Sequence, residues 1–314
     1  MYKIGILSTA SIVPRFLNAS RQLDNCKVTS IASRSLEKAS EKAGLWNIER
    51  AYGSYEELIA SDVDIVYVAM INSEHYRYAK LALENGKHVF CEKPMTLSEE
   101  NSRELFALAQ ARGLFIMEMQ KTLFLPVIKK VKEIIDSGSL GKIMMADFSS
   151  SFKSNYNTWM NDPDKGGGAF YNNLIYSVEL MQYLKGCGFT DFGGLSCKSE
   201  TGVADQFSVS MLMEDGTLAA NKTSTLVDTC HFAYIYGEKG HVEIPEYWKA
   251  RKAAVYYDDG SREELDYPCD YELVYEIEHA LGCIEKGLTE SPVVTGKLTI
   301  DSIRFINEIS DSWK

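Results

Sequence analysis

The sequence predicts an α/β protein in which a doubly wound parallel sheet is followed by an α+β domain with a mostly antiparallel sheet. Residues 1–120 alternate short apolar runs with helical stretches, as a parallel sheet covered by helices requires. From about Gly141 the strands become longer and richer in Ser, Thr, Phe and Tyr. The chain has 314 residues, and a single core stops growing at roughly 250–300. We therefore expect two domains, 1–120 and 121–314.

Apolar runs and helix-ending residues define the elements of the first domain. Five strands are expected at 2–7, 27–32, 64–70, 88–91 and 114–119, and the run 64–70 is almost wholly apolar, as a strand buried on both faces should be. Helices are expected between them at 11–23, 35–46, 73–85 and 98–113. Gly86 suits a helix C-terminal cap, and Ser98 opens a capping-box-like pattern.

The second domain is expected to begin near Gln120, before a helix over 124–136. Hairpin signals stand at Glu214-Asp215-Gly216 and Asp258-Asp259-Gly260. Further helices are expected at 169–184, 271–286 and 299–313. These features predict an antiparallel sheet with helices packed on one face. The other face of the sheet must then be covered by something else, such as a second subunit.

Composition excludes several classes of function. The formal net charge is -11, which opposes binding to nucleic acid or to an acidic membrane surface. The seven cysteines have no CxxC pair, so neither a disulfide framework nor a zinc site is indicated. No apolar run approaches the roughly 20 residues of a membrane span, and no signal peptide is evident at the N-terminus. We expect a cytoplasmic protein that binds a small molecule.

The first strand-to-helix turn is the expected place for a pyrophosphate in such a sheet. A GxGxxG motif would place its glycines at Ser8, Ala10 and Val13, and all three are replaced. Ser8 and Ala10 are still small enough for backbone amides to approach phosphates, and nearby hydroxyls can donate. A turn without a ligand is an equal alternative from these residues alone.

The end of the second strand favours NADP over NAD. An NAD site usually has an acid there for the ribose 2′-hydroxyl, but this sequence has Ser33-Arg34-Ser35. The Arg34 fork suits a 2′-phosphate, with Ser33 and Lys38 as further donors. The alternative is a solvated arginine.

Two further strand ends lie at the edge where ligands bind in open α/β sheets. At the first, Met70-Ile71-Asn72 leads to His75, and Asn72 can either cap the next helix or contact a cofactor. At the second, Glu92-Lys93-Pro94 follows a buried strand. A lysine there can donate a proton to a carbonyl or accept one from a hydroxyl, although a lone lysine is more often solvated.

A glycine run opens a helix in the second domain. Gly166-Gly167-Gly168 permits close approach of the backbone to a ligand. Asn172 and Tyr176 follow at a spacing that places them on one helix face. They predict a pocket, with satisfied polar groups of the core as the alternative.

The chain resembles the Gfo/Idh/MocA family over essentially its whole length, and within it the branch of dimeric dihydrodiol dehydrogenase and NADP-dependent xylose dehydrogenase. The resemblance is carried by Asn72 with His75, Gly86-Lys87-His88-Val89, Glu92-Lys93-Pro94, Gly166-Gly167-Gly168-Ala169, Gly237-Glu238-Lys239-Gly240, and Gly287 with Glu290-Ser291-Pro292. It implies a Rossmann dinucleotide-binding domain and a second domain for substrate binding and oligomerisation.

The resemblance also implies roles for single residues. Lys93 is expected to be the central proton donor or acceptor, with Tyr176 assisting. The family usually has Asp and Gly where this chain has Asn172 and Leu174. Asn172 can orient a hydroxyl but cannot act as a base, and Leu174 reshapes the pocket.

Together these features predict an NAD(P)-dependent oxidoreductase that prefers NADP and acts on a secondary alcohol or ketone of a sugar, polyol or diol. We expect a homodimer formed through the second domain's sheet and no bound metal. A silent NADP-binding sensor, favoured by Asn172 and Leu174, and a glycosidase with a tightly held cofactor remain alternatives. The expected catalytic residues are Lys93, Tyr176 and Asn172. The expected cofactor-binding residues are Ser8, Thr9, Ala10, Ser11, Ile12, Ser33, Arg34, Lys38, Met70, Ile71, Asn72, His75, Glu92 and Lys93.

Overall fold

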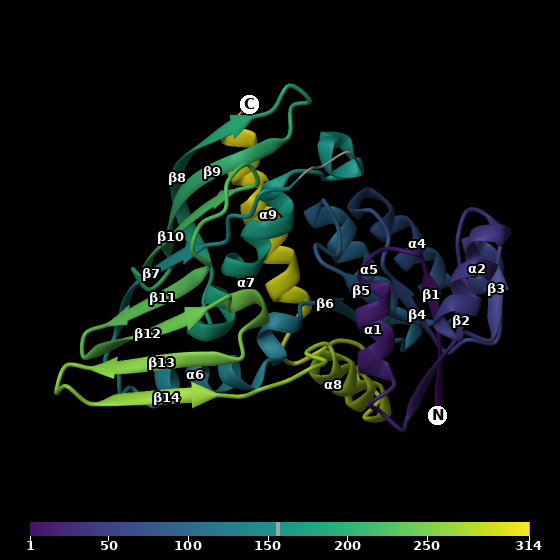
Figure 1. Ribbon diagram of the computed structural model, residues 1–314, viewed down its shortest axis with the longest axis horizontal. Helices are drawn as coiled ribbons and strands as arrows, with labels where there is room; N and C mark the ends of the chain where they lie inside the picture. Colours follow the sequence, from purple (N-terminus) through teal and green to yellow (C-terminus); the bar gives the residue numbers. More distant parts are fainter. Residues whose placement is uncertain (155–157, 314) are drawn as a thin grey trace. The chain divides into compact units, whose positions relative to one another are not determined.

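The computed structural model describes residues 1–154 and 158–313 (Figure 1). The chain divides into two compact units, Met1–Gln120 with Tyr271–Ile300 and Lys121–Asp270 with Asp301–Lys314. The sequence assigned all of 121–314 to the second domain, but 271–300 belong to the first unit. The reason is that α8 (Val274–Glu285) packs against α1 (Val13–Ser20).

The first unit contains a six-stranded sheet with the order β3-β2-β1-β4-β5-β6. All its strands are parallel, which confirms the predicted doubly wound sheet. The strand order reverses between β1 and β4, the position at which such sheets bind ligands. The strands are β1 (Tyr2–Leu7), β2 (Cys26–Ala32), β3 (Arg50–Tyr52), β4 (Ile65–Val68), β5 (His88–Glu92) and β6 (Ile116–Met119).

The helices of the first unit follow the expected order. Besides α1 and α8 they are α2 (Leu36–Trp46), α3 (Tyr55–Ile59), α4 (Asn72–Glu84) and α5 (Glu99–Arg112). Ser98 caps α5 by accepting a hydrogen bond from the backbone N–H of Asn101, and Gly113 ends it in the left-handed region. The sequence missed β3 and α3, which are too short to show a period.

The second unit contains an eight-stranded sheet with the order β14-β13-β12-β11-β7-β10-β9-β8. Only the β7–β10 pair is parallel among its pairings, so the predicted mostly antiparallel sheet is confirmed. Both predicted hairpins are present, between β9 and β10 and between β13 and β14. The strands are β7 (Ile143–Ser149), β8 (Phe189–Lys198), β9 (Ala204–Met213), β10 (Leu218–Ser224), β11 (Phe232–Gly237), β12 (Gly240–Pro245), β13 (Lys252–Tyr257) and β14 (Arg262–Asp266).

Helices cover one face of this sheet, as Figure 1 shows for α6 (Pro126–Asp136), α7 (Ile175–Lys185) and α9 (Gly296–Ser312). Within this unit, Phe305 of α9 stacks on Phe189 of β8 with ring centroids 4.8 Å apart. The short helices are η1 (Lys121–Phe124), η2 (Trp159–Asn161), η3 (Pro163–Lys165), η4 (Phe170–Leu174) and η5 (Tyr247–Lys249). No helix in the described part of the chain is both long enough and apolar enough to cross a membrane.

The opposite face of the sheet carries a row of aromatic and apolar side chains. The strand register places its members side by side across six strands, and three of them are exposed by about two fifths: Met145 at 44%, Leu218 at 42% and Leu212 at 38%. We call this set the outer row: Tyr256, His241, Tyr236, Met145, Leu218 and Leu212.

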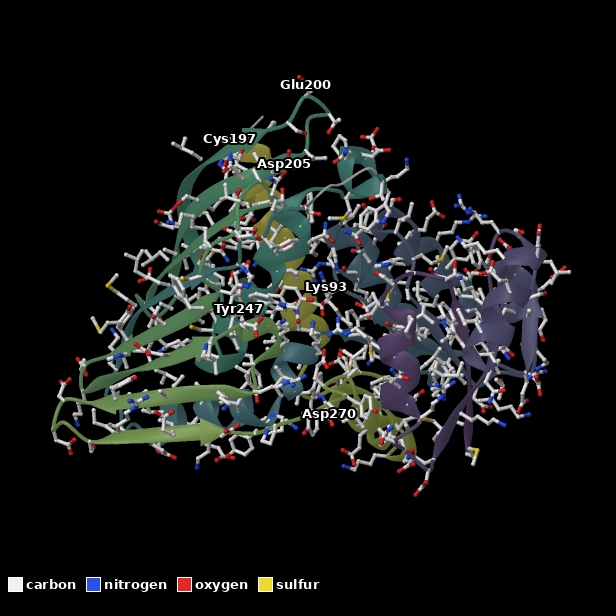
Figure 2. All side chains as sticks on the ribbon, viewed as in Figure 1. Lys93, Cys197, Glu200, Asp205, Tyr247 and Asp270 are labelled. Carbon is white, nitrogen blue, oxygen red and sulfur yellow. The ribbon has the colours of Figure 1, made fainter. Side chains whose placement is uncertain are left out.

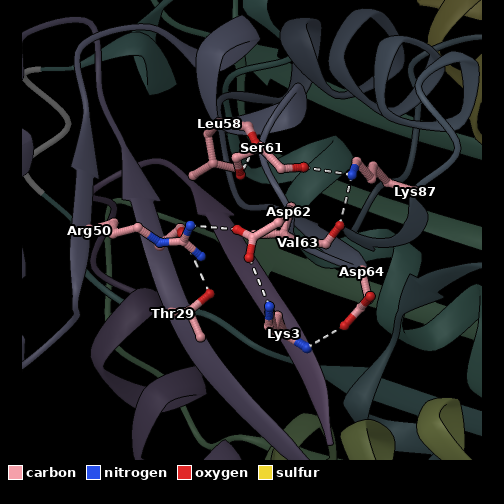
Figure 3. A network of polar contacts seen from close by, with 10 residues as sticks. Lys3, Thr29, Arg50, Leu58, Ser61, Asp62, Val63, Asp64 and Lys87 are labelled. Carbon is pink, nitrogen blue, oxygen red and sulfur yellow. Dashed lines mark hydrogen bonds and ion pairs between the residues drawn. The ribbon is translucent and has the colours of Figure 1, made fainter.

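A network of polar contacts lies at the amino ends of strands in the first unit (Figure 3). Asp62 is bound by Lys3 at 2.7 Å and by Arg50 at 2.5 Å. These contacts lower the pKa of Asp62 to about 2, chiefly through its hydrogen bonds to the two cations. The Lys87 ammonium donates to the backbone oxygens of Ser61 and Val63 at 2.7 and 2.9 Å.

Candidate active site

The turn after β1 keeps glycine-like geometry without glycine. Ser8 has φ of 141°, a region that side chains rarely occupy and that costs about 1–3 kcal/mol. Its Oγ accepts a hydrogen bond from the backbone N–H of Ala10 at 2.9 Å, and its own backbone N–H donates to the backbone oxygen of Ala32 at 3.2 Å. The serine hydroxyl therefore helps to hold the turn in the form that a dinucleotide motif requires.

This turn fits a diphosphate. In the part of the chain that the structure describes, no protein group accepts the backbone N–H of Thr9, Ser11 or Ile12. These amides precede α1, whose N-cap residue Ile12 provides no side-chain cap. Unsatisfied amides at the N-terminus of a helix bind anions well.

Arg34 follows β2 as an exposed cation. No acid lies within ion-pair distance of it among residues 1–154 and 158–313, and its charge acts on the Tyr55 phenol, where it opposes the rise in pKa that burial causes. Ser33 is buried, and its Oγ bonds the backbone of Ser35. Ser35 caps α2 by accepting the N–H of Lys38. The two serines thus shape the loop, while the Arg34 and Lys38 side chains stay exposed.

His75 connects two strand ends of the first unit. It is 1% exposed, and its ring nitrogens lie 2.9 Å from the Pro94 oxygen and 3.1 Å from the Met70 oxygen. Burial is the main cause that lowers its pKa. The alternative in which Asn72 caps α4 does not hold, because Ile71 occupies the N-cap position and Asn72 is the first helical residue.

Lys93 stands directly after β5, in a loop that is held from two sides. The Lys93–Pro94 peptide is cis. His75 contacts the Pro94 oxygen, and the backbone N–H of Met95 donates to Glu118 of β6 at 2.9 Å. Glu118 is 1% exposed and also accepts the Thr299 hydroxyl at 2.7 Å. Lys93, labelled in Figure 2, is therefore presented by a fixed segment of backbone.

Glu92 is oriented from within the sheet. The Tyr67 hydroxyl donates to its carboxylate at 2.5 Å, and the Tyr67 ring stacks on Phe16 of α1 at 3.8 Å between centroids. Burial and the neighbouring Glu92 charge raise the pKa of Tyr67, so this phenol stays protonated and keeps donating.

In the second unit the glycine run is packed against backbone. A Cβ on Gly167 would lie 2.4 Å from the Met160 oxygen, and the N–H of Gly168 donates to that same oxygen at 2.7 Å. Asn172 Nδ2 donates to the oxygens of Gly166 and Gly168 at 3.2 and 2.9 Å. The Asn172 amide therefore fastens the glycine loop to the helix that follows it.

The start of this helix differs from the prediction. Phe170–Leu174 form a π-helical turn before α7, so Asn172 and Tyr176 do not have ordinary α-helical spacing. Leu174 is fully buried. Tyr176 lies in the first turn of α7 and is half-buried.

Lys121 is a neighbour of Tyr176 that sequence reasoning missed. Its Nζ lies 3.2 Å from the Tyr176 hydroxyl and 4.9 Å from the centre of that ring. Lys121 is 7% exposed. The available signal was weak: a single charged residue, Lys121, between the polar Gln120 and Thr122, just before the apolar run 123–125.

Comparisons with known proteins decide the family. The model for the oxidoreductase family with an NAD-binding Rossmann fold, GFO_IDH_MocA, matches residues 2–119, and the GFO/IDH/MocA C-terminal domain matches 128–243. The trans-1,2-dihydrobenzene-1,2-diol dehydrogenase of Mus musculus is 31% identical over 92% of this chain and 90% of that protein. The chain belongs to the Gfo/Idh/MocA family. It is an NAD(P)-dependent oxidoreductase.

Two further proteins are similar to this chain over nearly the whole length of both chains. The scyllo-inositol 2-dehydrogenase (NADP(+)) IolU of Bacillus subtilis is 27% identical over 98% of this chain and 96% of that protein. Among solved structures, the aldose-aldose oxidoreductase from Caulobacter crescentus has a TM-score of 0.89 at 22% identity, covering 99% of this chain and 97% of that one. That likeness concerns the fold.

Proposed function

We propose that this oxidoreductase, which acts on CH–OH groups, prefers NADP and interconverts a secondary alcohol and a ketone on a sugar, polyol or diol. The observation that carries the proposal is the placement of Lys93 after β5 in a loop held by His75 and Glu118. An acid/base group contributes to catalysis only if it is positioned, and this loop is positioned by buried partners.

The first unit supports the cofactor assignment. The Thr9, Ser11 and Ile12 amides suit the diphosphate. Arg34 has no acidic partner among the described residues and suits a 2′-phosphate, with Lys38 as a second cation. The remaining expected cofactor contacts, from Met70 to His75 and at Glu92, surround the ends of β4 and β5.

The chain's own groups would handle the proton. A bound nicotinamide supplies or accepts the hydride. Lys93 would take the hydroxyl proton at Nζ during oxidation and return one to the carbonyl oxygen during reduction. Tyr176 would assist through its hydroxyl. Asn172 would act by holding the glycine loop, since its Nδ2 already bonds that loop.

Lys93→Met tests the proposal. We expect turnover to fall by about 10²–10⁴-fold, the usual share of a positioned acid/base, while NADPH still binds as measured by nucleotide fluorescence. Lys87→Met is the matched control, because Lys87 stands before the other end of β5 and bonds only backbone oxygens. An active Lys93→Met variant would remove this residue from its role.

A silent NADP-binding sensor is the second candidate, favoured by Leu174 and by the structural use of Asn172. A screen of NADP reduction with sugars and polyols separates the two. Tight NADP binding with no turnover of any substrate would favour the sensor.

We also propose that the protein is a cytoplasmic homodimer whose second-unit sheets face each other. The outer row supports the dimer, because its exposed apolar members Met145, Leu218 and Leu212 lie side by side and contiguous exposed apolar patches mark interaction sites. Light scattering after gel filtration should give a dimer for the wild type and for Leu45→Asp, and a monomer for Met145→Asp. A monomeric wild type contradicts the dimer.

A further inference from the structure

Lys121 is a buried cation whose ammonium donates fewer hydrogen bonds to the described residues than it can make. An ammonium has three N–H donors and no acceptor, and among the described residues the Lys121 ammonium has one hydrogen-bond acceptor, the Tyr176 hydroxyl at 3.2 Å. Because the ammonium can only donate, the Tyr176 oxygen accepts. The Tyr176 proton must then point to another acceptor.

No counter-ion accompanies this charge. Within the described ranges 1–154 and 158–313, no carboxylate lies within 4.0 Å of the Lys121 ammonium. Lys185, a lysine of the same unit whose side chain is 12% exposed, is instead paired with Asp215 at 2.9 Å. Buried charges in proteins are normally paired with an opposite charge. Among the described residues, Lys185 has such a carboxylate partner and Lys121 does not.

The surroundings of Lys121 are fixed. Lys121 opens η1, and the hydroxyl of the next residue, Thr122, donates to the Trp248 backbone oxygen at 3.1 Å. The neighbouring Tyr247, labelled in Figure 2, is fully buried. The cation is thus anchored beside the phenol that we expect to contact the substrate hydroxyl.

We propose that Lys121 binds an anionic group of the substrate, a carboxylate or a phosphate, so that the substrate is an acidic sugar derivative. This inference rests on the proposed function, because it takes Tyr176 as a substrate-contacting residue. The anion would satisfy the remaining donors of Lys121 and place a nearby hydroxyl against Tyr176. Lys121 would therefore determine specificity without moving the reacting proton.

Binding of three matched probes tests the inference independently of turnover. Calorimetry on the NADPH-loaded protein would use D-glucose, D-glucuronate and D-glucose 6-phosphate. We expect one anionic probe to bind at least about tenfold more tightly than glucose, since hydrogen bonds to charged groups contribute about 1.5–3 kcal/mol. Whichever anion is preferred identifies the carboxylate or the phosphate as the natural group.

Substitutions of Lys121 test whether this residue recognises the anion or only supports the fold. Lys121→Met should remove the preference for the anion and leave glucose binding little changed, and Lys121→Gln should do the same if the methionine variant folds poorly. Lys130→Met, on α6 of the same unit, is the control that should keep the preference. Equal binding of all three probes by the wild type, or equal losses for all three in both Lys121 variants, would overturn the inference.

The same series distinguishes this inference from the proposed function. If anions bind through Lys121 but the Lys93→Met variant turns over substrate like the wild type, then the proposed role of Lys93 fails and the anion site stands. If neutral sugars are turned over through Lys93 without any anion preference, then the proposed function stands and the anion site fails.

Discussion

The two ends of β5 carry the same pair of residue types and use them differently. At the amino end, Lys87 bonds the oxygens of Ser61 and Val63, and His88 Nδ1 accepts the N–H of Phe115 at 2.9 Å. At the carboxyl end, His75 contacts the oxygens of Met70 and Pro94 and so holds the segment that presents Lys93. The same residue types thus fasten backbone at the amino end of β5, whereas at its carboxyl end the histidine fixes the backbone on either side of the lysine that we propose as the acid/base.

Of the substitutions that test this difference between the two ends of β5, His75→Ala should have the largest effect. We expect kcat to fall by about 10²-fold, because misplacing a catalytic group by about 1 Å has that effect. The unfolding free energy should fall by about 1–3 kcal/mol from the carbonyls left unsatisfied. Steady-state kinetics and urea unfolding measure the two effects. His88→Ala is the control and should lose stability with kcat nearly unchanged; parallel losses of kcat in both variants would contradict the distinction.

Arg34→Ala should give the next largest effect. Loss of a charge-assisted bond to the 2′-phosphate should weaken NADP binding by about 10- to 100-fold and leave NAD binding nearly unchanged. Fluorescence titration with both nucleotides measures this. Arg50→Ala, whose guanidinium binds Asp62 in the network of Figure 3, should alter neither affinity. Equal losses for the two nucleotides would refute the Arg34 assignment.

The pH dependence of stability should reveal His75 and, more weakly, His88. Burial lowers the pKa of His75 and of His88 below the usual 6.5. The unfolded chain then binds the extra protons, so stability is complete above about pH 6.5 and falls as the pH drops below it. For His75 the slope is at most about 1.4 kcal/mol per pH unit, and for the partly solvated His88 it is smaller. Urea unfolding from pH 8 to 5 should show a reduced slope in His75→Ala; an unchanged slope would mean that the folded ring is already protonated.

Asp62→Asn should produce the smallest change. The Lys3 and Arg50 contacts lower the pKa of Asp62 to about 2. This stabilising contribution is therefore present above the unfolded value of 3.8 and disappears as the pH falls through about 2. The urea midpoints of variant and wild type should differ slightly near neutral pH and converge in acid. A difference that grows in acid would contradict this.

The sequence predicts elements with strong local signals. β1, both hairpins and the Ser98 cap are found where composition and turn residues place them. Short elements without a period were missed, as β3 and α3 show. The π-helical turn was missed as well, because a single extra residue in a helical turn leaves no mark on residue types.

The candidate site residues were predicted from two kinds of signal, the carboxyl ends of strands and the glycine run that precedes Asn172 and Tyr176. Arg34, His75 and Lys93 follow from the rule that ligands meet the carboxyl edge of the sheet. Glu118 and Lys121 depend on partners far along the chain, Thr299 and Tyr176, so no local pattern points to their bonds. Glu118 at least stands out as a charged residue in an apolar strand, whereas Lys121 lies between the polar Gln120 and Thr122.

The packing of Gly167 against Met160 also limits how this chain can diverge. Any side chain at residue 167 collides with backbone that cannot swing aside, and its neighbours Gly166 and Gly168 have positive φ values of 69° and 86°. In a deep mutational scan, residue 167 should therefore be the least tolerant position of a glycine run that tolerates little change. Libraries intended to alter substrate choice gain most by leaving that codon untouched.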